Sequence, residues 1–362
     1  MNIQVNITDN ILKTQYKMDL PYWAYQDYFI FKPEFDGSVD EYVNIIKNYK
    51  KLIFSNHADL DSSIKIINSE TPNCEPIYSK FNKPLDNSLD KLINLTHITF
   101  GYSFNKPLAN SLDQLTNLTM INFGYCFNKS LVNSLDKLIN LTMINFGYCF
   151  DKSLANSLDK LINITKINFS YYFNKSLDNS LNKLINLTHL TFGVNFNEPL
   201  NNSLDKLINL THLTFGISFN QPLINSLDQL INLTQIIFGF DFDQPLDNSL
   251  NKLINLTHLT LRYKFNQVLF LPPNIKILTL GCENQSLIDN LPNSIEQLNF
   301  SSNFNLPLDN LPSSIKKISF GIDSCYNKPL NNLPKSLEVL ELSTKYKFEK
   351  KNIPENCKII YL

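Results

Sequence analysis

Four of the five histidines occupy one position of a repeating sequence, because they are separated by multiples of 23 residues: His97, His189, His212 and His258. Imidazole is a common metal ligand, and two imidazoles on adjacent repeats could share one ion. His189 and His212 are one repeat apart, so on neighbouring strands they should lie about 5 Å from each other. No carboxylate or thiol is in register with them, which favours surface contacts over a metal site.

Charged and thiol side chains repeat in the same way. Lysines align at Lys83, Lys106, Lys129, Lys152 and Lys175. Such a row can attract an acidic partner. An aspartate row largely offsets its field and favours a solvated edge instead: Asp90, Asp113, Asp136 and Asp159. Cys126 and Cys149 also align, and we expect free thiols because the chain shows no secretory signal.

Sequence motifs of enzymes are not found. The chain has no G-x-S-x-G, phosphate-binding loop or H-E-x-x-H, and none of its six cysteines forms the C-x-x-C pair of a zinc site. A net charge of −1 argues against nucleic-acid binding, and no apolar run is long enough to span a membrane. The sequence therefore predicts a non-enzymatic, cytoplasmic monomer without cofactor or metal, which binds neither nucleic acid nor membrane.

The phenylalanines define the frame that would position these residues. They recur every 23 residues, at Phe81, Phe104, Phe127, Phe150, Phe173, Phe196, Phe219, Phe242 and Phe265. Such a period is typical of a solenoid whose units are one strand and one return segment. Leu118-x-x-Ile121-x-Phe123 has the form of a leucine-rich-repeat strand. We therefore expect a repeat solenoid of about a dozen leucine-rich-repeat-like coils, with a parallel β-sheet on the concave side and a phenylalanine spine inside.

The segments between the strands give further expectations. The return segment of the early units, as at residues 87–92, begins with helix-start residues but is short, which favours short helices or 3₁₀ turns on the convex side. After Phe265 it becomes Leu-Pro-x-Ser/Asn-Ile/Leu, which predicts extended segments. The Asn or Asp after each spine Phe should bond turn amides coil after coil. Single glycines after the strands, such as Gly147 and Gly216, look like turn positions.

At this point the residues resemble a known family. The strings FNKPLDNSLDKLINLTHITF from Phe81 and FNQPLINSLDQLINLTQIIF from Phe219 look like the FNIP repeat, a leucine-rich-repeat subtype of social amoebae and large viruses of amoebae. The resemblance covers roughly residues 77–350 and departs mildly where Ser130, Ser153 and Ser176 replace proline. It implies an intracellular interaction module without catalytic residues. Many relatives carry an N-terminal F-box, but the residues after Leu20-Pro21 lack its helical pattern.

Three regions follow from these patterns. Residues 1–76 do not repeat, residues 77–264 hold the 23-residue units, and residues 265–362 hold shorter units and a C-terminal cap. In the first region Ile3, Val5 and Ile7 alternate as a strand would, and Ser38-x-x-Glu41 has the form of a capping box. We favour an N-terminal cap over the first coil; a small adaptor-binding domain is the alternative.

The predicted binding residues are those that flank the inward-facing strand positions and so point outward from the sheet. They form a mostly uncharged strip suited to a protein partner. The strip comprises His97, Thr99, Met120, Asn122, Met143, Asn145, Lys166, Asn168, His189, Thr191, His212, Thr214, Gln235, His258 and Thr260. Four aligned tyrosines could border it, although partial burial is equally compatible with the pattern: Tyr102, Tyr125, Tyr148 and Tyr171.

The predicted function is a scaffold that binds an unidentified partner protein. The alternative is a substrate receptor of a ubiquitin ligase, in which residues 1–76 form a divergent F-box-like segment that binds the ligase adaptor. Asn-Leu-Thr recurs as well, for example at Asn186 and Asn209, and is interpreted as a consequence of the repeat rather than as a row of glycan acceptors.

Overall fold

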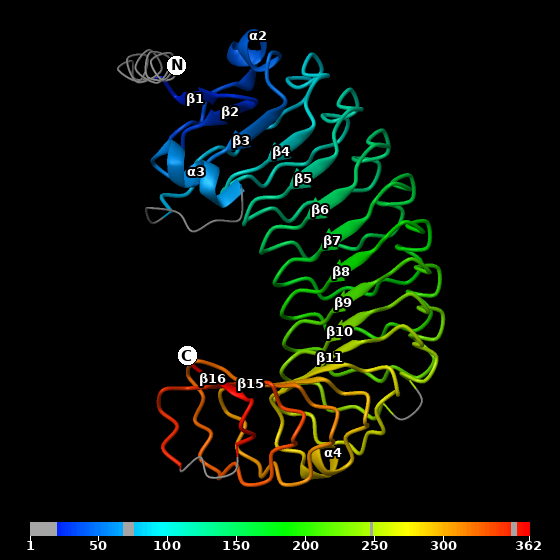
Figure 1. Ribbon diagram of the computed structural model, residues 1–362. Helices are drawn as coiled ribbons and strands as arrows, with labels where there is room; N and C mark the ends of the chain where they lie inside the picture. The colour runs from blue at the N-terminus through cyan, green and yellow to red at the C-terminus, as the bar shows by residue number, and fades with distance from the viewer. Residues whose placement is uncertain (1–19, 68–75, 247–248, 349–352) are drawn as a thin grey trace, which may run out of the picture.

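The computed structural model describes residues 20–67, 76–246, 249–348 and 353–362. In this part of the chain 16 strands form one sheet, in which each strand pairs with the next in chain order. Only β1 and β2 pair in antiparallel fashion, and Figure 1 shows the stack of coils as an open arc. Ile3, Val5, Ile7 and Cys74 lie outside the described residues. The predicted solenoid with a parallel sheet is confirmed.

The 23-residue units supply the strands from β4 to β11. Each strand from β4 to β9 has an apolar residue between two half-exposed polar or flexible ones, and that central side chain is buried. Neighbouring strands pair without slippage, so Ile98 lies beside Ile121 and Ile121 beside Ile144. The strands are β4 His97–Thr99, β5 Met120–Asn122, β6 Met143–Asn145, β7 Lys166–Asn168, β8 His189–Thr191, β9 His212–Thr214, β10 Gln235–Ile237 and β11 His258–Leu261.

The later units continue the sheet with slightly longer strands. These are β12 Ile277–Leu280, β13 Gln297–Phe300, β14 Lys317–Phe320, β15 Val339–Leu342 and β16 Lys358–Tyr361. One return segment differs from the predicted extended form, because α4 (Gln285–Asp289) is a helix. The Asn284 side chain accepts a hydrogen bond from the Leu287 amide and so caps it, and Leu287 and Ile288 are buried beneath it.

The return segments of the 23-residue units are chains of single turns. The amides of Ser111, Leu115 and Leu118 donate to carbonyls three residues earlier, at 2.7–2.9 Å. Between residues 76 and 246 no helix forms. Of the two conformations that the sequence left open, the structure therefore has isolated turns of 3₁₀ type.

Inside the coils the phenylalanine spine is confirmed. Phe127 and Phe150 are fully buried, and their rings stack with centroids 6.2 Å apart and 5° between planes. A second ring column comes from the strand ends, where Phe146 lies 4.5 Å from Phe150. Each coil from β4 to β10 therefore buries two aromatic rings that contact each other.

The asparagine ladder is also confirmed. Asn82 Oδ1 accepts from the Asn105 amide at 2.9 Å, and Asn105 Oδ1 accepts from the Asn128 amide at 3.0 Å. Asp151 takes the same role toward Asn174 and also forms an ion pair with Lys175, a member of the lysine row, at 2.8 Å. One side chain per coil thus satisfies a turn amide of the next coil.

The glycines after the strands lie where the backbones of adjacent coils approach closely. None of the described glycines has a positive φ, whereas Asn156, Asn201 and Asn225 in the return segments do. A β carbon on Gly216 would lie 1.7 Å from the carbonyl oxygen of Gly193 in the preceding coil. These glycines do begin turns, since the Gly193 carbonyl accepts from the Phe196 amide at 3.3 Å, and they also permit close backbone approach between coils.

The coils lie closer together beside the sheet than in the interior. Ring centroids are 4.2 Å apart for His189 and His212 on the sheet and 4.4 Å for Tyr125 and Tyr148 just after it. Spine rings are about 6 Å apart, as for Phe196 and Phe219 at 6.0 Å. The sheet side is therefore the shorter side of the curve. In Figure 1 the return segments follow the outer rim of the arc.

Residues 20–67 extend the same sheet at its N-terminal end. The elements are β1 Tyr22–Tyr25, β2 Tyr28–Phe31, the 3₁₀ helix η1 Val39–Tyr42, α2 Val43–Ile46, β3 Lys51–Phe54 and α3 Leu60–Ile67. The Ser38 side chain caps η1 by accepting from the Asp40 amide. Phe35 and Phe54 stack on Phe81, with centroids 5.7 and 4.2 Å from it. None of the described helices has the length and apolarity needed to cross a membrane.

Candidate protein-binding face

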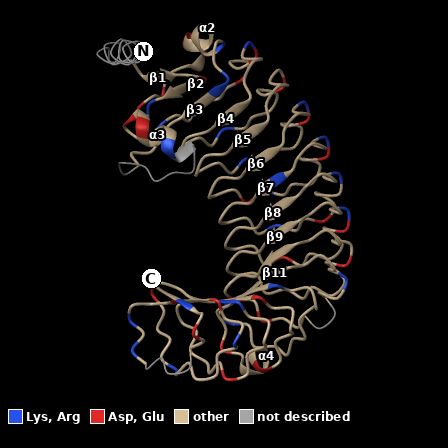
Figure 2. Ribbon diagram, in the orientation of Figure 1, with Lys and Arg blue, Asp and Glu red and all other residues tan. Residues whose placement is uncertain are grey.

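The paired strands bring the predicted outward residues together in two rows. One row runs from His97 through Met120 to His258, and the other from Thr99 through Asn122 to Thr260, with each residue beside its repeat equivalent. Ile237 completes the second row. Figure 2 shows that charged residues of the middle coils gather mainly on the return segments. Lys166 of β7 is the charged residue among the strands β4 to β11. The face is therefore mostly uncharged.

Hydrogen bonds fix the second row. Asn122 donates through Nδ2 to Thr99 Oγ1 at 2.9 Å. Asn145 donates in turn to Asn122 Oδ1, and Asn168 to Asn145 Oδ1, both at 2.5 Å. These amides are consequently held in one orientation before any partner arrives, which lowers the entropy cost of binding.

A threonine beside each outward histidine sets the tautomer of its ring. Thr188 Oγ1 donates its single proton to the Thr165 carbonyl at 3.0 Å, so it can only accept from His189 Nδ1, which lies 2.9 Å away. Thr211 and His212 repeat the arrangement. The hydrogen-bond network therefore assigns the proton to Nδ1 and leaves Nε2 as an outward acceptor.

The two adjacent histidines stack rather than converge. Their rings lie 4.2 Å apart and nearly parallel, at 9°, so their in-plane lone pairs run side by side and do not meet at one ion. The part of the chain that the structure describes holds no group of three or more His, Cys, Asp or Glu placed to bind a metal. Partial burial, then His212, then Lys166 lower the pKa of His189.

Replacing His212 with asparagine should raise the pKa of His189 toward its ordinary value, but only in part, because burial is the larger cause of the depression. An NMR pH titration of the imidazole resonances measures this. Gln235→Asn, on the same face but two strands from His189, should leave the pKa of His189 unchanged. An unaltered titration of His189 in His212→Asn would contradict the assigned coupling.

The same shifts give the pH dependence of stability its sign. The folded-state pKa values of His97, His189 and His258 are all lowered, in each case first by burial. Their contribution to stability is therefore complete above the unfolded pKa, near 6.5, and is lost as the pH falls through the folded values. We expect a shallow loss, because these rings are partly exposed.

A tyrosine column borders the face where the strands end. The rings of Tyr102, Tyr125, Tyr148 and Tyr171 stack at 4.4–4.5 Å. Tyr125 and Tyr171 are 37% exposed, whereas Tyr102 and Tyr148 are partly buried, so the column is a partly accessible rim. Desolvation within the stack, then the Tyr171 phenol, raise the pKa of Tyr148 to about 12. The rim is therefore uncharged at neutral pH.

Cys126 and Cys149 lie next to this rim and are free thiols, as are the other three described cysteines. Burial raises the pKa of both thiols, and the neighbouring Cys149 adds to the shift at Cys126. Raised pKa values disfavour the reactive thiolate form.

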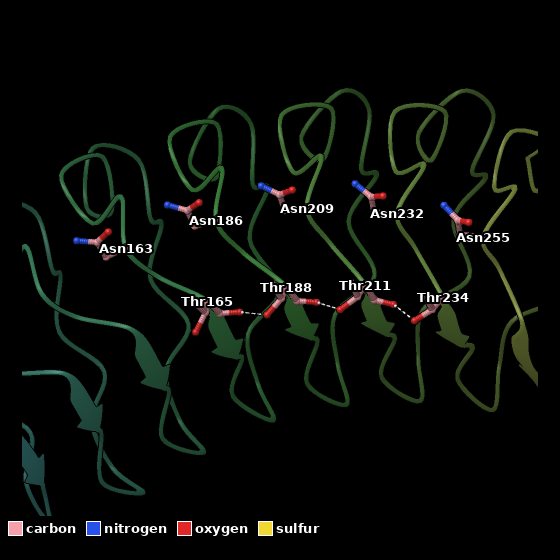
Figure 3. Close-up of a pocket in the computed structure, with 9 residues that line it drawn as sticks. All are labelled: Asn163, Thr165, Asn186, Thr188, Asn209, Thr211, Asn232, Thr234 and Asn255. Atoms are coloured by element: carbon pink, nitrogen blue, oxygen red, sulfur yellow. Dashed lines mark hydrogen bonds between the residues drawn. The ribbon is translucent and has the colours of Figure 1, made fainter.

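One surface was missed at the sequence level. A shallow groove of about 790 Å³ crosses five coils where each return segment meets its strand. Figure 3 shows its lining, which consists of asparagines and threonines only: Asn163, Thr165, Asn186, Thr188, Asn209, Thr211, Asn232, Thr234 and Asn255. The recurring Asn-Leu-Thr tripeptide was the available signal, but periodicity gives no indication of where a surface is hollowed.

Comparison with known proteins agrees with this architecture. The chain is similar to an internalin, InlF of Listeria monocytogenes, with 14% identity and a TM-score of 0.54. The match covers 92% of this chain and 86% of the internalin chain. It is also similar to a chain of the glycosylated Toll–Spatzle complex of Drosophila, with 15% identity and a TM-score of 0.58. That match covers 89% of this chain and 48% of the Drosophila chain. At these identities the likeness concerns the fold.

Another solved structure with likeness to the chain is CroV588, a circular leucine-rich-repeat protein of a giant virus, at 22% identity and a TM-score of 0.49, covering 94% of this chain and 70% of that one. No curated protein matches the sequence. The profile of the FNIP Repeat family matches residues 284–323, within the range of the predicted resemblance but in the shorter C-terminal units. The chain thus resembles FNIP-repeat proteins in residues 284–323 and is built as a leucine-rich-repeat-like solenoid.

Proposed function

We propose that the chain is a non-enzymatic scaffold that binds another protein on the outward face of β4 to β11 and the tyrosine rim beside it. The observation that carries this proposal is the register of the strands, which places half-exposed, mostly uncharged side chains side by side over eight coils. At the strand spacing of a sheet, the face is about 34 Å long.

The residue types on this surface suit a protein partner. Met120 and Met143 are flexible apolar side chains that adapt to a bound surface. Tyrosine contributes strongly to binding energy at interfaces. The fixed amides of Asn122 and Asn145 and the outward Nε2 of the histidines add directional hydrogen bonds. Because the surface carries little charge, its desolvation costs less than that of ion pairs.

The N-terminal residues enter the proposal as a cap. What supports this is that β3 pairs in parallel with β4 and that Phe35 and Phe54 cover Phe81. Within residues 20–67 no contact favours the ubiquitin-ligase alternative. The free thiols of the described cysteines are in keeping with the cytoplasm as the compartment that we propose.

Site-specific photo-crosslinking tests the binding face. A benzophenone amino acid is placed at Met143 on β6 or at Tyr148 on the rim, and in the control at Lys137, which is exposed on the return segment of the same coil. We expect the first two positions to capture the same protein from a cell extract and Lys137 not to capture it. Equal capture at Lys137, or none at Met143 and Tyr148, would rule out this face.

A further inference from the structure

The asparagine–threonine groove adjoins the proposed protein-binding face on the side where the strands begin (Figure 3), and its Thr188 and Thr211 contact the histidines of that face. It crosses the coils of five consecutive repeats and has a volume of about 790 Å³. Its lining contains no charged side chain and no large apolar one. A ligand that fits it must therefore be uncharged and must make hydrogen bonds along its length.

Each asparagine side chain of the groove is oriented by one hydrogen bond and keeps further polar groups for a ligand. Asn186 Nδ2 donates to the Ile162 carbonyl at 3.0 Å, and Asn209 Nδ2 donates to the Ile185 carbonyl at 2.9 Å. Asn232 and Asn255 do the same toward the coil before them. One amide hydrogen and the Oδ1 atom of each side chain remain available. The row therefore presents one donor and one acceptor per coil, fixed in direction by the protein itself.

The threonines add acceptors. Thr188, Thr211 and Thr234 donate their hydroxyl hydrogens to the threonine carbonyl of the preceding coil, each at 3.0 Å. Their oxygens can therefore only accept from a ligand. The histidines take up part of this capacity at Thr188 and Thr211, whereas Thr234 precedes Gln235. The groove thus offers more acceptors than donors, which suits a ligand rich in hydroxyl groups.

A row of isoleucines follows the asparagines of the groove as an apolar ledge beside it, outside its lining. The residue before each asparagine is an isoleucine that stays about half exposed, for example Ile185 at 50% and Ile208 at 51%. The groove therefore combines a polar floor with an apolar border. Pyranose sugars have the same combination, because their hydroxyl groups radiate around the ring and their C–H groups lie on its faces.

The spacing of the groups distinguishes a sugar chain from a peptide. Equivalent groups on adjacent coils repeat at the strand separation of about 4.8 Å. An extended peptide advances about 3.3 Å per residue and presents like groups on one side every 6.6 Å, so it falls out of step within two coils. The sugar repeat of an extended β-1,4-linked chain is close to the coil spacing. Successive sugars of such a chain also turn over, but each carries hydroxyl groups on both edges, so every coil can meet one sugar.

We propose that this groove binds an uncharged, linear, β-linked oligosaccharide along the stack of coils, with one sugar unit over each coil. The five asparagines supply one donor and one acceptor to each unit, the threonines accept from its hydroxyls, and the isoleucine ledge packs against its C–H groups.

Isothermal titration calorimetry on the full chain tests the proposal with cellohexaose, chitohexaose and maltohexaose as probes. We expect at least one β-1,4-linked hexamer to bind, and α-linked maltohexaose, which coils, to bind at least tenfold more weakly. Affinity should rise at least tenfold from the trimer to the pentamer of that sugar and then level off, because the groove spans five coils. An uncharged decapeptide of Thr, Asn and Gly should not bind.

A matched pair of variants distinguishes ligand binding in the groove from the structural role of the asparagine side chains. Asn117 and Asn140 make the same backbone bond, to the carbonyls of Ile93 and Thr116, but do not line the groove. Asn209→Ala/Asn232→Ala should weaken oligosaccharide binding at least tenfold, and Asn117→Ala/Asn140→Ala less than twofold. Absence of binding by both β-linked hexamers at millimolar concentration, binding of the peptide instead, no dependence on length, or equal loss in both variants would overturn the proposal.

Discussion

Replacing Phe150 with alanine should lower the free energy of unfolding by about 3–5 kcal/mol. The side chain is fully buried, and its ring lies between those of Phe127 and Phe173, 6.2 Å from each. Its removal leaves a cavity that the neighbouring coils cannot close, because paired strands and the asparagine ladder hold their separation. The loss should therefore lie near the upper end of large-to-small substitutions.

Urea denaturation followed by circular dichroism measures this loss. Hydrogen exchange can locate it, because in a solenoid a defect acts first on the adjacent coils. Phe240→Ala is the matched control: Phe240 also stacks on a ring of the next coil, Tyr263, at 4.9 Å, but it is 39% exposed. Its loss should stay below about 1 kcal/mol. Similar losses for the two variants would argue against a buried spine.

Replacing Gly216 with alanine should destabilise the chain by about 1–3 kcal/mol although it adds only a methyl group. The new carbon would lie 1.7 Å from the Gly193 carbonyl oxygen, which cannot withdraw freely because it accepts from the Phe196 amide at 3.3 Å. The two coils must separate locally. A thermal melt should show a clear decrease of the transition temperature.

Gly321→Ala is the control for this substitution. The nearest atom to a β carbon there is the Phe300 carbonyl oxygen at 4.0 Å, and the backbone φ is not positive. Alanine should therefore be neutral, or stabilising by about 0.4–1 kcal/mol through the unfolded chain. If Gly216→Ala melts at the temperature of Gly321→Ala, close approach of the coils is not what requires glycine.

One coil between Gly101 and Gly239 already carries a side chain at the corresponding position. Ser170 takes the place of glycine between Gly147 and Gly193, and its hydroxyl donates to the Phe150 carbonyl at 2.5 Å and accepts from the Phe173 amide at 3.1 Å. The Ser170 hydroxyl thus makes hydrogen bonds to backbone groups of its own coil and of the preceding coil. A methyl group makes no such bonds.

Periodicity explains why much of the architecture could be predicted from the sequence. Residues that recur every 23 positions must share an environment, so the burial of Phe150, the pairing of Ile121 with Ile144 and the bond from Asn105 to Asn82 follow from one unit. The helix α4 could not be predicted in this way, because it occurs once and depends on the local cap at Asn284.

The candidate sites were predictable to a lesser degree. Strand alternation places His189 and Asn145 on the outward face, but it does not indicate that Thr188 fixes the histidine tautomer or that the two histidine rings stack. It also gives no reason for Gly216, whose constraint comes from a backbone atom of another coil. The groove was missed because each of its asparagine and threonine side chains has some polar groups bonded within the chain and others open to a ligand. Only the structure shows which groups are bonded and which are open.

The stacking of coils in a 23-residue register is tested most directly by cross-linking paired positions on adjacent strands. Thr191 on β8 lies beside Thr214 on β9, and Ile237 on β10 lies one strand further, about 9.6 Å from Thr191 by the strand spacing. With the short thiol reagent dibromobimane and peptide mass spectrometry, Thr191→Cys/Thr214→Cys should give the 191–214 link in high yield. Thr191→Cys/Ile237→Cys should give almost none. Equal yields in the two variants, or no 191–214 link, would contradict the solenoid.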